Sequence, residues 1–75
     1  MTEKLDIAVH DVDSSNVARI GHSAEHSVLR VVFKNGAVYD YAKVTEKQYI
    51  ALGVAESKGK FINAHIKPNH TVTKV

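Results

Sequence analysis

Five histidines are the residues of this chain best suited to metal chemistry, yet their spacing argues against a metal site. His22 and His26 are four residues apart but flank an expected loop, and His65 and His70 lie on opposite sides of Pro68. Neither pair forms the helical two-histidine arrangement with a nearby acid that zinc enzymes use. We therefore expect no metal and no other cofactor, with His65 partly buried in a helix and the other histidines solvated.

Nucleophilic catalysis has equally little support in the sequence. The chain has no cysteine, which excludes a thiolate nucleophile, disulfides and thiolate metal ligands. It also lacks a glycine-rich phosphate loop. Ser14 and Ser15 precede an apolar stretch, where adjacent serines usually form a turn and cap the next element. The sequence therefore predicts a non-catalytic protein rather than an enzyme.

Tyr39 and Tyr41 are the aromatic residues that could contact a ligand. They are two residues apart on an expected strand, so their side chains point to the same face. Two rings on one sheet face can stack nucleobases. They can equally fill a small core and expose only their hydroxyls. Both interpretations stay open at this level.

Basic residues follow Glu56, after which the chain has no further acid. The four lysines of this stretch are Lys58, Lys60, Lys67 and Lys74. Such a segment can attract phosphates, and a solvated lysine-rich surface has the same composition. Residues 1–13, in contrast, carry four carboxylates against one lysine.

Length and composition predict one small globular domain. The chain has 75 residues, of which 44% are hydrophobic and 24% charged. No apolar run approaches the roughly 20 residues of a membrane span, and no signal peptide opens the chain. We therefore expect no membrane contact and a cytoplasmic location.

Asn35-Gly36 predicts the turn of a central β-hairpin. A two-residue loop would place Asp40 on the apolar face of the hairpin, where an unpaired carboxylate is costly. A three-residue loop of residues 34–36, with Gly36 as a left-handed bulge, instead places Asp40 opposite Arg30. We favour this second register, which also puts both tyrosines on the apolar face.

Two strands are expected before the hairpin. Leu5, Ile7 and Val9 alternate with other residues, which is typical of a half-buried strand. A second strand is expected over residues 17–22. Its two faces are expected to carry Ala18, Ile20 and His22 on one side and Val17, Arg19 and Gly21 on the other.

Two helices are expected after the hairpin, at about residues 45–57 and 60–66. Thr45 and Gln48 form a capping-box pattern at the first helical turn. Gly53 is expected to allow a close approach to the sheet, and Gly59 to end the first helix. The sequence thus predicts an α+β fold, in which a small antiparallel β-sheet packs against two short C-terminal helices.

The face of the sheet opposite the helices is expected to carry Val28, Val32 and Val38. An apolar stripe of this kind must either stay in contact with water or be covered. We expect that burial of the stripe by a second copy would give a homodimer through the sheet.

An ordered set of short motifs in this chain resembles the KTSC domain family. The motifs are Ser14-Ser15-Asn16-Val17 followed by Ile20-Gly21, then Asn35-Gly36 followed by Val38-Tyr39-Asp40-Tyr41, and finally Ser57-Lys58-Gly59-Lys60-Phe61 followed by Asn63 and Ile66. The resemblance covers residue 12 to about residue 70. His22 and Ile62 depart from it, because they stand where the family usually carries aromatic residues.

The resemblance implies a single domain over residues 14–70, in a bacterial or phage protein. Residues 1–13 are then an acidic segment that can form a strand, and residues 71–75 a tail that can form a short edge strand. The family is named after the C-terminus of some lysyl-tRNA synthetases, and RNA binding is the function usually suggested for it.

The leading expectation is a non-catalytic module that binds RNA or another nucleic acid. The alternative is a homo-oligomeric protein-interaction module or a small-ligand-binding module. The expected contact residues are Lys58, Lys60, Asn63, Lys67, Arg30, Tyr39 and Tyr41.

Overall fold

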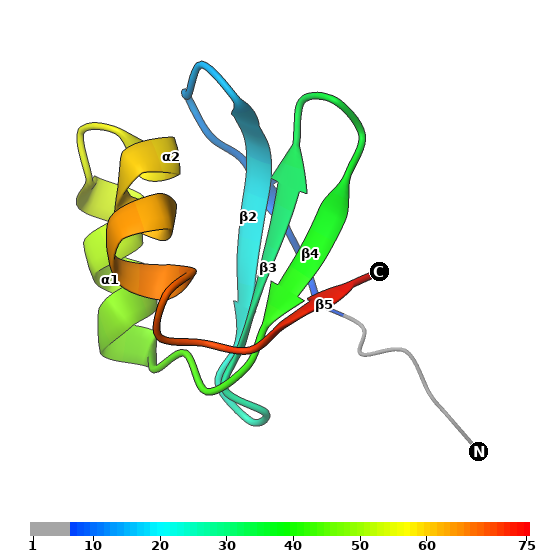
Figure 1. The fold of residues 1–75 in the computed structure, drawn as a ribbon, viewed down its shortest axis with the longest axis vertical. Helices are drawn as coiled ribbons and strands as arrows, with labels where there is room; N and C mark the ends of the chain where they lie inside the picture. The colour runs from blue at the N-terminus through cyan, green and yellow to red at the C-terminus, as the bar shows by residue number, and fades with distance from the viewer. Residues whose placement is uncertain (1–6) are drawn as a thin grey trace.

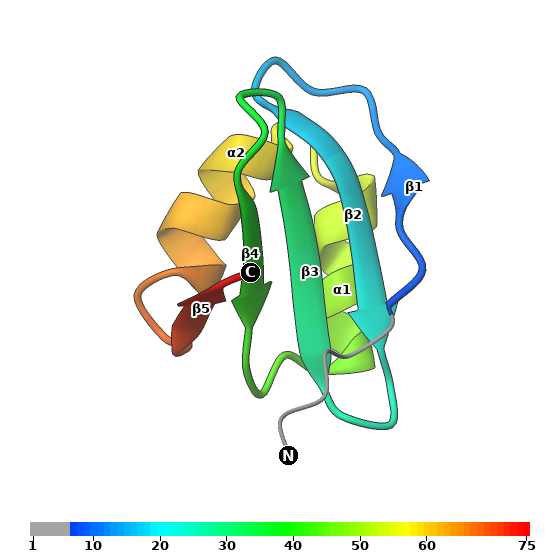
Figure 2. The same ribbon diagram turned by 90° about the vertical axis from the view of Figure 1, so that its right-hand side faces the viewer.

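An antiparallel sheet and a pair of helices form the two layers of the fold, which a computed structural model describes for residues 7–75 (Figure 1). The five strands neighbour one another in chain order: β1 (His10–Asp11), β2 (Val17–Ser23), β3 (Val28–Phe33), β4 (Val38–Tyr41) and β5 (Val72–Lys74). Between β4 and β5 the chain forms α1 (Glu46–Val54), α2 (Lys58–Phe61) and the π-helical turn η1 (Ile62–Ile66), which continues α2. The helices cover one face of the sheet, and Figure 2 looks onto the opposite face. The predicted α+β fold is confirmed.

The hydrophobic core lies between the sheet and the helices. Its buried members are Val17, Ile20, Leu29, Val31, Tyr41, Val44, Leu52, Ile62 and Ile66. The helix through α2 and η1 contributes Ile62 and Ile66, which are four residues apart and therefore share one face.

The hairpin has the register that was favoured from the sequence, with Asp40 opposite Arg30. Arg30 pairs with Asp40, and Val31 pairs with Tyr39. The Phe33 N–H donates to the Ala37 carbonyl at 2.8 Å, which closes a three-residue loop. Gly36 in this loop has a φ of 93°, the left-handed conformation that glycine adopts without strain. The register brings Tyr41 into the core beside Leu29.

The expected face assignment of β2 is wrong, because this strand contains a bulge. Val17 pairs with Phe33 while Arg19 pairs with Val32, so Ala18 is an extra residue in the ladder. The extra residue reverses the alternation of side chains on one side of it. Val17 and Ile20 therefore both lie fully buried in the core instead of on opposite faces.

Helix α1 begins as predicted, with both hydrogen bonds of the capping box between Thr45 and Gln48. It ends at Val54 rather than near residue 57, because Ala55 adopts an extended conformation. Gly53 is exposed and a Cβ at this position would meet nothing within 4 Å, so the expected close approach to the sheet is wrong.

Helix α2 begins earlier than expected. Ser57 is its N-cap, and the Ser57 hydroxyl accepts a hydrogen bond from the Lys60 N–H at 3.4 Å. Gly59 does not end the first helix but lies buried inside α2. A Cβ there would come within 2.5 Å of the Asn16 Oδ1, so a glycine lets this turn of the helix pack closely against Asn16.

The two ends of the described chain both join the sheet. The N-terminal strand is β1 at His10–Asp11, so the strand expected from Leu5 to Val9 is wrong for residues 7–9, and Leu5 lies outside the described residues. At the other end, β5 pairs with β4 as the edge strand expected of the tail.

Candidate nucleic-acid interface

The residues expected to contact nucleic acid lie in three separate places. Arg30 is on the sheet face opposite the helices, and Lys58 and Lys60 are on the first turn of α2. The remaining four residues line one cleft, at the edge of the sheet where the chain passes from η1 to β5. These four are Tyr39, Tyr41, Asn63 and Lys67.

The cleft has a volume of about 220 Å³. Asn63 and Lys67 are four residues apart on the helix, so they face it together. Phe33 and Val72 complete the lining, which includes no carboxylate. Lys74 lies at its edge, because β5 pairs this residue with Tyr39.

The two tyrosines differ in burial, and both expose their hydroxyls. Tyr41 is only 4% exposed, and the half-buried Tyr39 packs edge-on against Phe33 with 5.7 Å between ring centroids. Within residues 7–75 no buried side-chain oxygen lacks a hydrogen-bond partner, and neither tyrosine hydroxyl is bonded to another described residue. The two hydroxyls therefore reach solvent, where they can bind a ligand in the cleft.

Burial makes the Tyr41 hydroxyl harder to ionise than a phenol in water. Desolvation raises the pKa of Tyr41 above its usual value of 10.0, and the neighbouring Tyr39 raises it further. Any phenol is protonated at neutral pH, so the Tyr41 hydroxyl can donate a hydrogen bond there, and the raised pKa extends this to more alkaline solution. The cleft thus offers donors from Tyr41, Asn63 and Lys67 to a single acceptor-rich ligand.

The raised pKa of Tyr41 predicts a loss of stability in alkaline solution. In the unfolded chain the phenol ionises near pH 10, whereas in the folded chain it keeps its proton. The Tyr41 contribution is therefore fully present below pH 10 and is lost as the pH rises through the folded-state pKa. Denaturant unfolding at neutral pH and at about pH 11 should show a smaller alkaline loss for Tyr41→Phe than for the parent. Identical losses in the two proteins would contradict this assignment.

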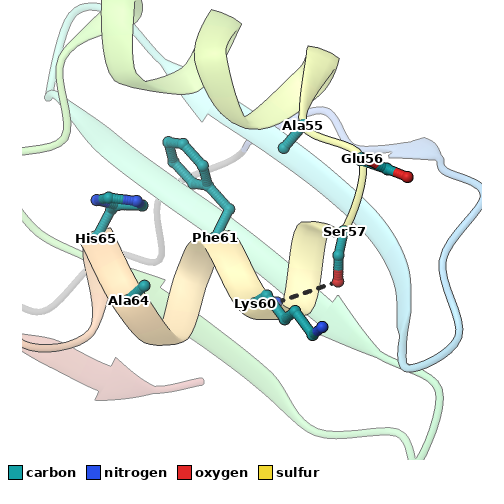
Figure 3. Close-up of a pocket in the computed structure, with 7 residues that line it drawn as sticks. All are labelled: Ala55, Glu56, Ser57, Lys60, Phe61, Ala64 and His65. Carbon is teal, nitrogen blue, oxygen red and sulfur yellow. Dashed lines mark hydrogen bonds between the residues drawn. The ribbon is translucent and has the colours of Figure 1, made fainter.

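Lys58 and Lys60 occupy a different surface from the cleft. The Lys58 ammonium donates to the Ala55 carbonyl at 3.2 Å, which holds this side chain against the end of α1. Lys60 is exposed beside a wider depression of about 650 Å³ between the helices, which also contains Glu56 (Figure 3). The two lysines therefore do not converge with the tyrosines.

Arg30 is held by an ion pair on the outer sheet face. Its Nε and Nη2 atoms donate to the two carboxylate oxygens of Asp40 at 2.7 and 2.9 Å. The side chains of Arg30 and Asp40 are only 15% and 18% exposed. This guanidinium stabilises the hairpin and lies on the opposite face of the sheet from the cleft.

The motif residues near Ser14 and Ser57 meet each other in the structure. The Ser14 hydroxyl accepts a hydrogen bond from the Val17 N–H at 3.3 Å, and Ser57 caps α2. Asn16 packs against Gly59, so the turn before β2 lies against the first turn of α2. Ser15 is exposed beside this turn. These motif residues therefore join the sheet to the helix that carries Asn63 and Lys67.

The histidines are arranged differently from the expectation. His65 is exposed, whereas His22 and His70 are half-buried. The His22 Nε2 lies 2.6 Å from the Val44 carbonyl, and the His70 Nδ1 lies 2.8 Å from the Ala42 carbonyl. Each histidine ring can thus donate a hydrogen bond to a backbone carbonyl in the segment that follows β4.

The two departures from the motif pattern have structural roles. The His22 ring stacks on Tyr49 with 5.1 Å between centroids, and Ile62 is buried in the core. Neither residue lines the cleft. Residues 7–75 contain no group of three potential metal ligands, and no helix among them is long and apolar enough to cross a membrane.

Three residues of the cleft region were not predicted from the sequence to belong to the site: Phe33, Val72 and Lys74. A register for the edge strand would have found two of them, because pairing Val72 with Tyr41 also places Lys74 beside Tyr39. Only three residues form that strand, which is too short for alternation to fix a register.

Comparison with known proteins gives consistent matches. The KTSC domain family matches residues 13–70. An uncharacterized protein from Stutzerimonas stutzeri is 36% identical over 59 residues, which is 79% of this chain and 83% of the relative. A protein from Tsukamurella paurometabola is 35% identical over 57 residues, or 76% of this chain and 85% of the relative. The crystal structure of a KTSC domain protein from Yersinia pestis superposes with a TM-score of 0.86 at 28% identity, covering 93% of this chain and 99% of that one.

Proposed function

The chain belongs to the KTSC domain family, and we propose that it is a non-catalytic module that binds single-stranded nucleic acid, RNA in the first place, through the cleft between η1 and β4–β5. One observation carries the proposal. Four of the seven residues selected from the sequence, Tyr39, Tyr41, Asn63 and Lys67, come together in that cleft. We place this role in the cytoplasm of a bacterium or of a phage-infected cell.

The chemistry of the cleft suits a phosphate and the sugar or base next to it. Lys67 supplies a positive charge in the cleft and Lys74 a second one at its edge, and the lining residues carry no negative charge to oppose them. Asn63 offers both a donor and an acceptor, which can read the edge of an unpaired base. Half or more of the hydrogen bonds to nucleic acid usually go to phosphate and sugar, which matches this set of donors.

The packing of the tyrosines favours contact through hydroxyl groups rather than through base stacking. The Tyr41 ring is in the core, and one side of Tyr39 is occupied by Phe33. Base stacking contributes about 1–3 kcal/mol per base where rings are free. Since the Tyr41 ring is buried and Tyr39 is half-buried, we expect weak binding that depends on few charges.

Removal of the cleft lysines should weaken RNA binding more than removal of the α2 lysines. We expect Lys67→Ala/Lys74→Ala to lower the affinity for single-stranded RNA at low salt. The slope of log affinity against log salt should also become shallower by about 0.7 for each lost phosphate contact. The measurement is a fluorescence-anisotropy titration at several salt concentrations.

The double variant Lys58→Ala/Lys60→Ala is the matched control, because it removes the same charge from the chain. It should retain nearly the parent slope, since Lys58 is bonded to a carbonyl and Lys60 lies outside the cleft. Asn63→Ala should weaken binding without changing the slope. Equal effects of the two lysine pairs would point to unspecific attraction, and absence of binding at low salt would overturn the proposed function.

A further inference from the structure

The cleft between η1 and β4–β5 is closed at one end. The chain leaves η1 at Ile66 and crosses to β5 past the end of β4, as Figure 1 shows. Two contacts hold this crossing against Ala42. The Ala42 N–H donates to the Thr71 carbonyl at 2.9 Å, and the His70 Nδ1 lies 2.8 Å from the Ala42 carbonyl. The crossing therefore blocks the cleft at the end of β4, and a ligand enters from the opposite end.

The cleft has a positive charge and a phenol hydroxyl toward each end. Tyr41 is the last residue of β4, and Lys67 is the residue at which the crossing begins, so both belong to the closed end. Tyr39 lies two residues back along β4, about 7 Å toward the open end. There β5 pairs Lys74 with Tyr39.

The closed end is too narrow for a strand that continues in both directions. The cleft volume of about 220 Å³ is below the roughly 300–1,000 Å³ of pockets that enclose a small molecule. Tyr41 is only 4% exposed, so only a group that protrudes from its ligand can reach the hydroxyl. An internal phosphodiester is flanked by a sugar on both sides, whereas a terminal phosphate has a sugar on one side only. The closed end therefore fits a terminal phosphate better than an internal one.

We propose that the cleft binds the phosphorylated end of a single RNA strand, an inference that rests on the proposed function. The terminal phosphate contacts Lys67 and Tyr41 at the closed end, and Lys74 contacts the next phosphate. Asn63, one helical turn before Lys67, faces the first nucleotide.

The chemistry of a phosphate monoester matches this set of donors. A monoester carries a charge of about −1.5 to −2 at pH 7 and has three free oxygens that accept hydrogen bonds. An internal phosphodiester has a single negative charge and only two such oxygens. The residues that line the cleft include no carboxylate that would repel the additional charge.

A competition titration with one RNA sequence in four forms tests the proposal. The forms carry a 5′-phosphate, a 3′-phosphate, hydroxyls at both ends, or hydroxyls at both ends and two further nucleotides. Each unlabelled form competes against the same labelled RNA in fluorescence anisotropy. We expect phosphorylation of one end to tighten binding about tenfold, on the order of one additional charge-assisted hydrogen bond. The longer RNA adds two internal phosphate charges and should gain much less.

The outcomes separate this inference from the proposed function. If phosphorylation of neither end improves binding more than the added nucleotides do, the inference is overturned, while binding of the hydroxyl-ended RNA leaves the proposed function in place. Absence of binding by all four forms overturns the proposed function, and the inference with it.

Tyr41→Phe tests the place of the phosphate within the cleft. The variant keeps the ring in the core and removes only the hydroxyl, so the affinity ratio of phosphorylated to hydroxyl-ended RNA should fall toward one. Tyr49→Phe is the matched control, because Tyr49 is also half-buried but its hydroxyl lies 3.4 Å from the His10 Nδ1, outside the cleft. It should keep the parent ratio. Lys67→Gln, at an exposed position, should lower the ratio without any change in the core. A parent-like ratio in both Tyr41→Phe and Lys67→Gln overturns the assignment.

The corresponding nucleoside monophosphate distinguishes an RNA end from a free nucleotide. It has the same terminal phosphate but no second phosphate for Lys74. It should therefore compete more weakly than the phosphorylated RNA. A nucleoside monophosphate that competes as strongly as the phosphorylated RNA would overturn the RNA end as the ligand.

Discussion

Replacement of Arg30 by alanine is expected to lower the free energy of unfolding by about 2 kcal/mol. Its ion pair with Asp40 has two hydrogen bonds, and both side chains are largely buried on the outer face. Loss of one partner from a fully buried pair costs about 3–5 kcal/mol, and exposed pairs contribute at most about 1 kcal/mol. The exposures of 15% and 18% place this pair between the two cases.

Two further variants distinguish the loss of the Arg30–Asp40 attraction from the cost of leaving Asp40 without Arg30. In Arg30→Thr/Asp40→Thr neither charge of this pair is left without the other, and a threonine pair suits neighbouring strands, so most of the stability should return. Arg19→Ala breaks an ion pair with Asp11 of similar length, 2.9 Å, whose side chains are 57% and 85% exposed. It should change stability little. Denaturant unfolding measures all three, and equal losses for Arg30→Ala and Arg19→Ala would contradict the role of burial.

The same variants bear on function, because Arg30 was among the residues expected to contact RNA. Its side chain lies on the sheet face away from the helices and is bonded to Asp40. We therefore expect Arg30→Thr/Asp40→Thr to bind RNA as the parent does. A large loss of affinity in this stable double variant would bring the outer face back into the interface.

The hairpin could be predicted from sequence because a local energetic cost decides between its registers. One register leaves Asp40 unpaired on the apolar face, whereas the other pairs it with Arg30, and the structure has the second. The start of α1 could also be predicted from the sequence, since the capping box needs only Thr45 and Gln48. The hairpin register and the start of α1 each depend on residues that are close in sequence or directly paired.

The features that were missed depend on contacts between distant segments. The bulge at Ala18 has no signature in the sequence, because the alternation of β2 looks regular without it. Gly53 and Gly59 look alike as helix-weakening residues, yet only Gly59 has a neighbour, Asn16, that requires the absence of a Cβ. Whether a position requires glycine depends on which atoms lie next to it in the folded structure.

The candidate site could be predicted only in part, because it too combines local spacing with contacts between distant segments. Asn63 and Lys67 share a helix face by their spacing, and Tyr39 and Tyr41 share a strand face. That these two faces meet could not be derived, since it depends on how η1 crosses β4. Lys58 and Lys60 appeared equivalent to Lys67 by charge alone, but they lie on the first turn of the helix, away from the tyrosines.

Gly21→Ala is expected to destabilise the protein by about 2 kcal/mol, although the substitution adds only one methyl group. A Cβ at Gly21 would overlap the backbone carbonyl of Ala8 and press on the Val9 side chain. A backbone cannot yield as a flexible side chain can, so residues 7–9 must move away from the outer sheet face. Ile7, which is buried outside the main core, would then be exposed. Full burial of such a side chain contributes about 1.5–3 kcal/mol, which sets the expected loss.

Gly53→Ala is the matched control, because the same substitution should there have the opposite sign. Gly53 is exposed in α1 with nothing near its Cβ position, so alanine should stabilise the helix by up to about 1 kcal/mol. The mechanism at Gly21 is tested by combining Gly21→Ala with Ile7→Ala. If the methyl group acts by displacing residues 7–9, Ile7 has already lost its contacts, and the second substitution should add little. Additive losses would show instead that residues 7–9 stay in place, and that the strain lies within β2.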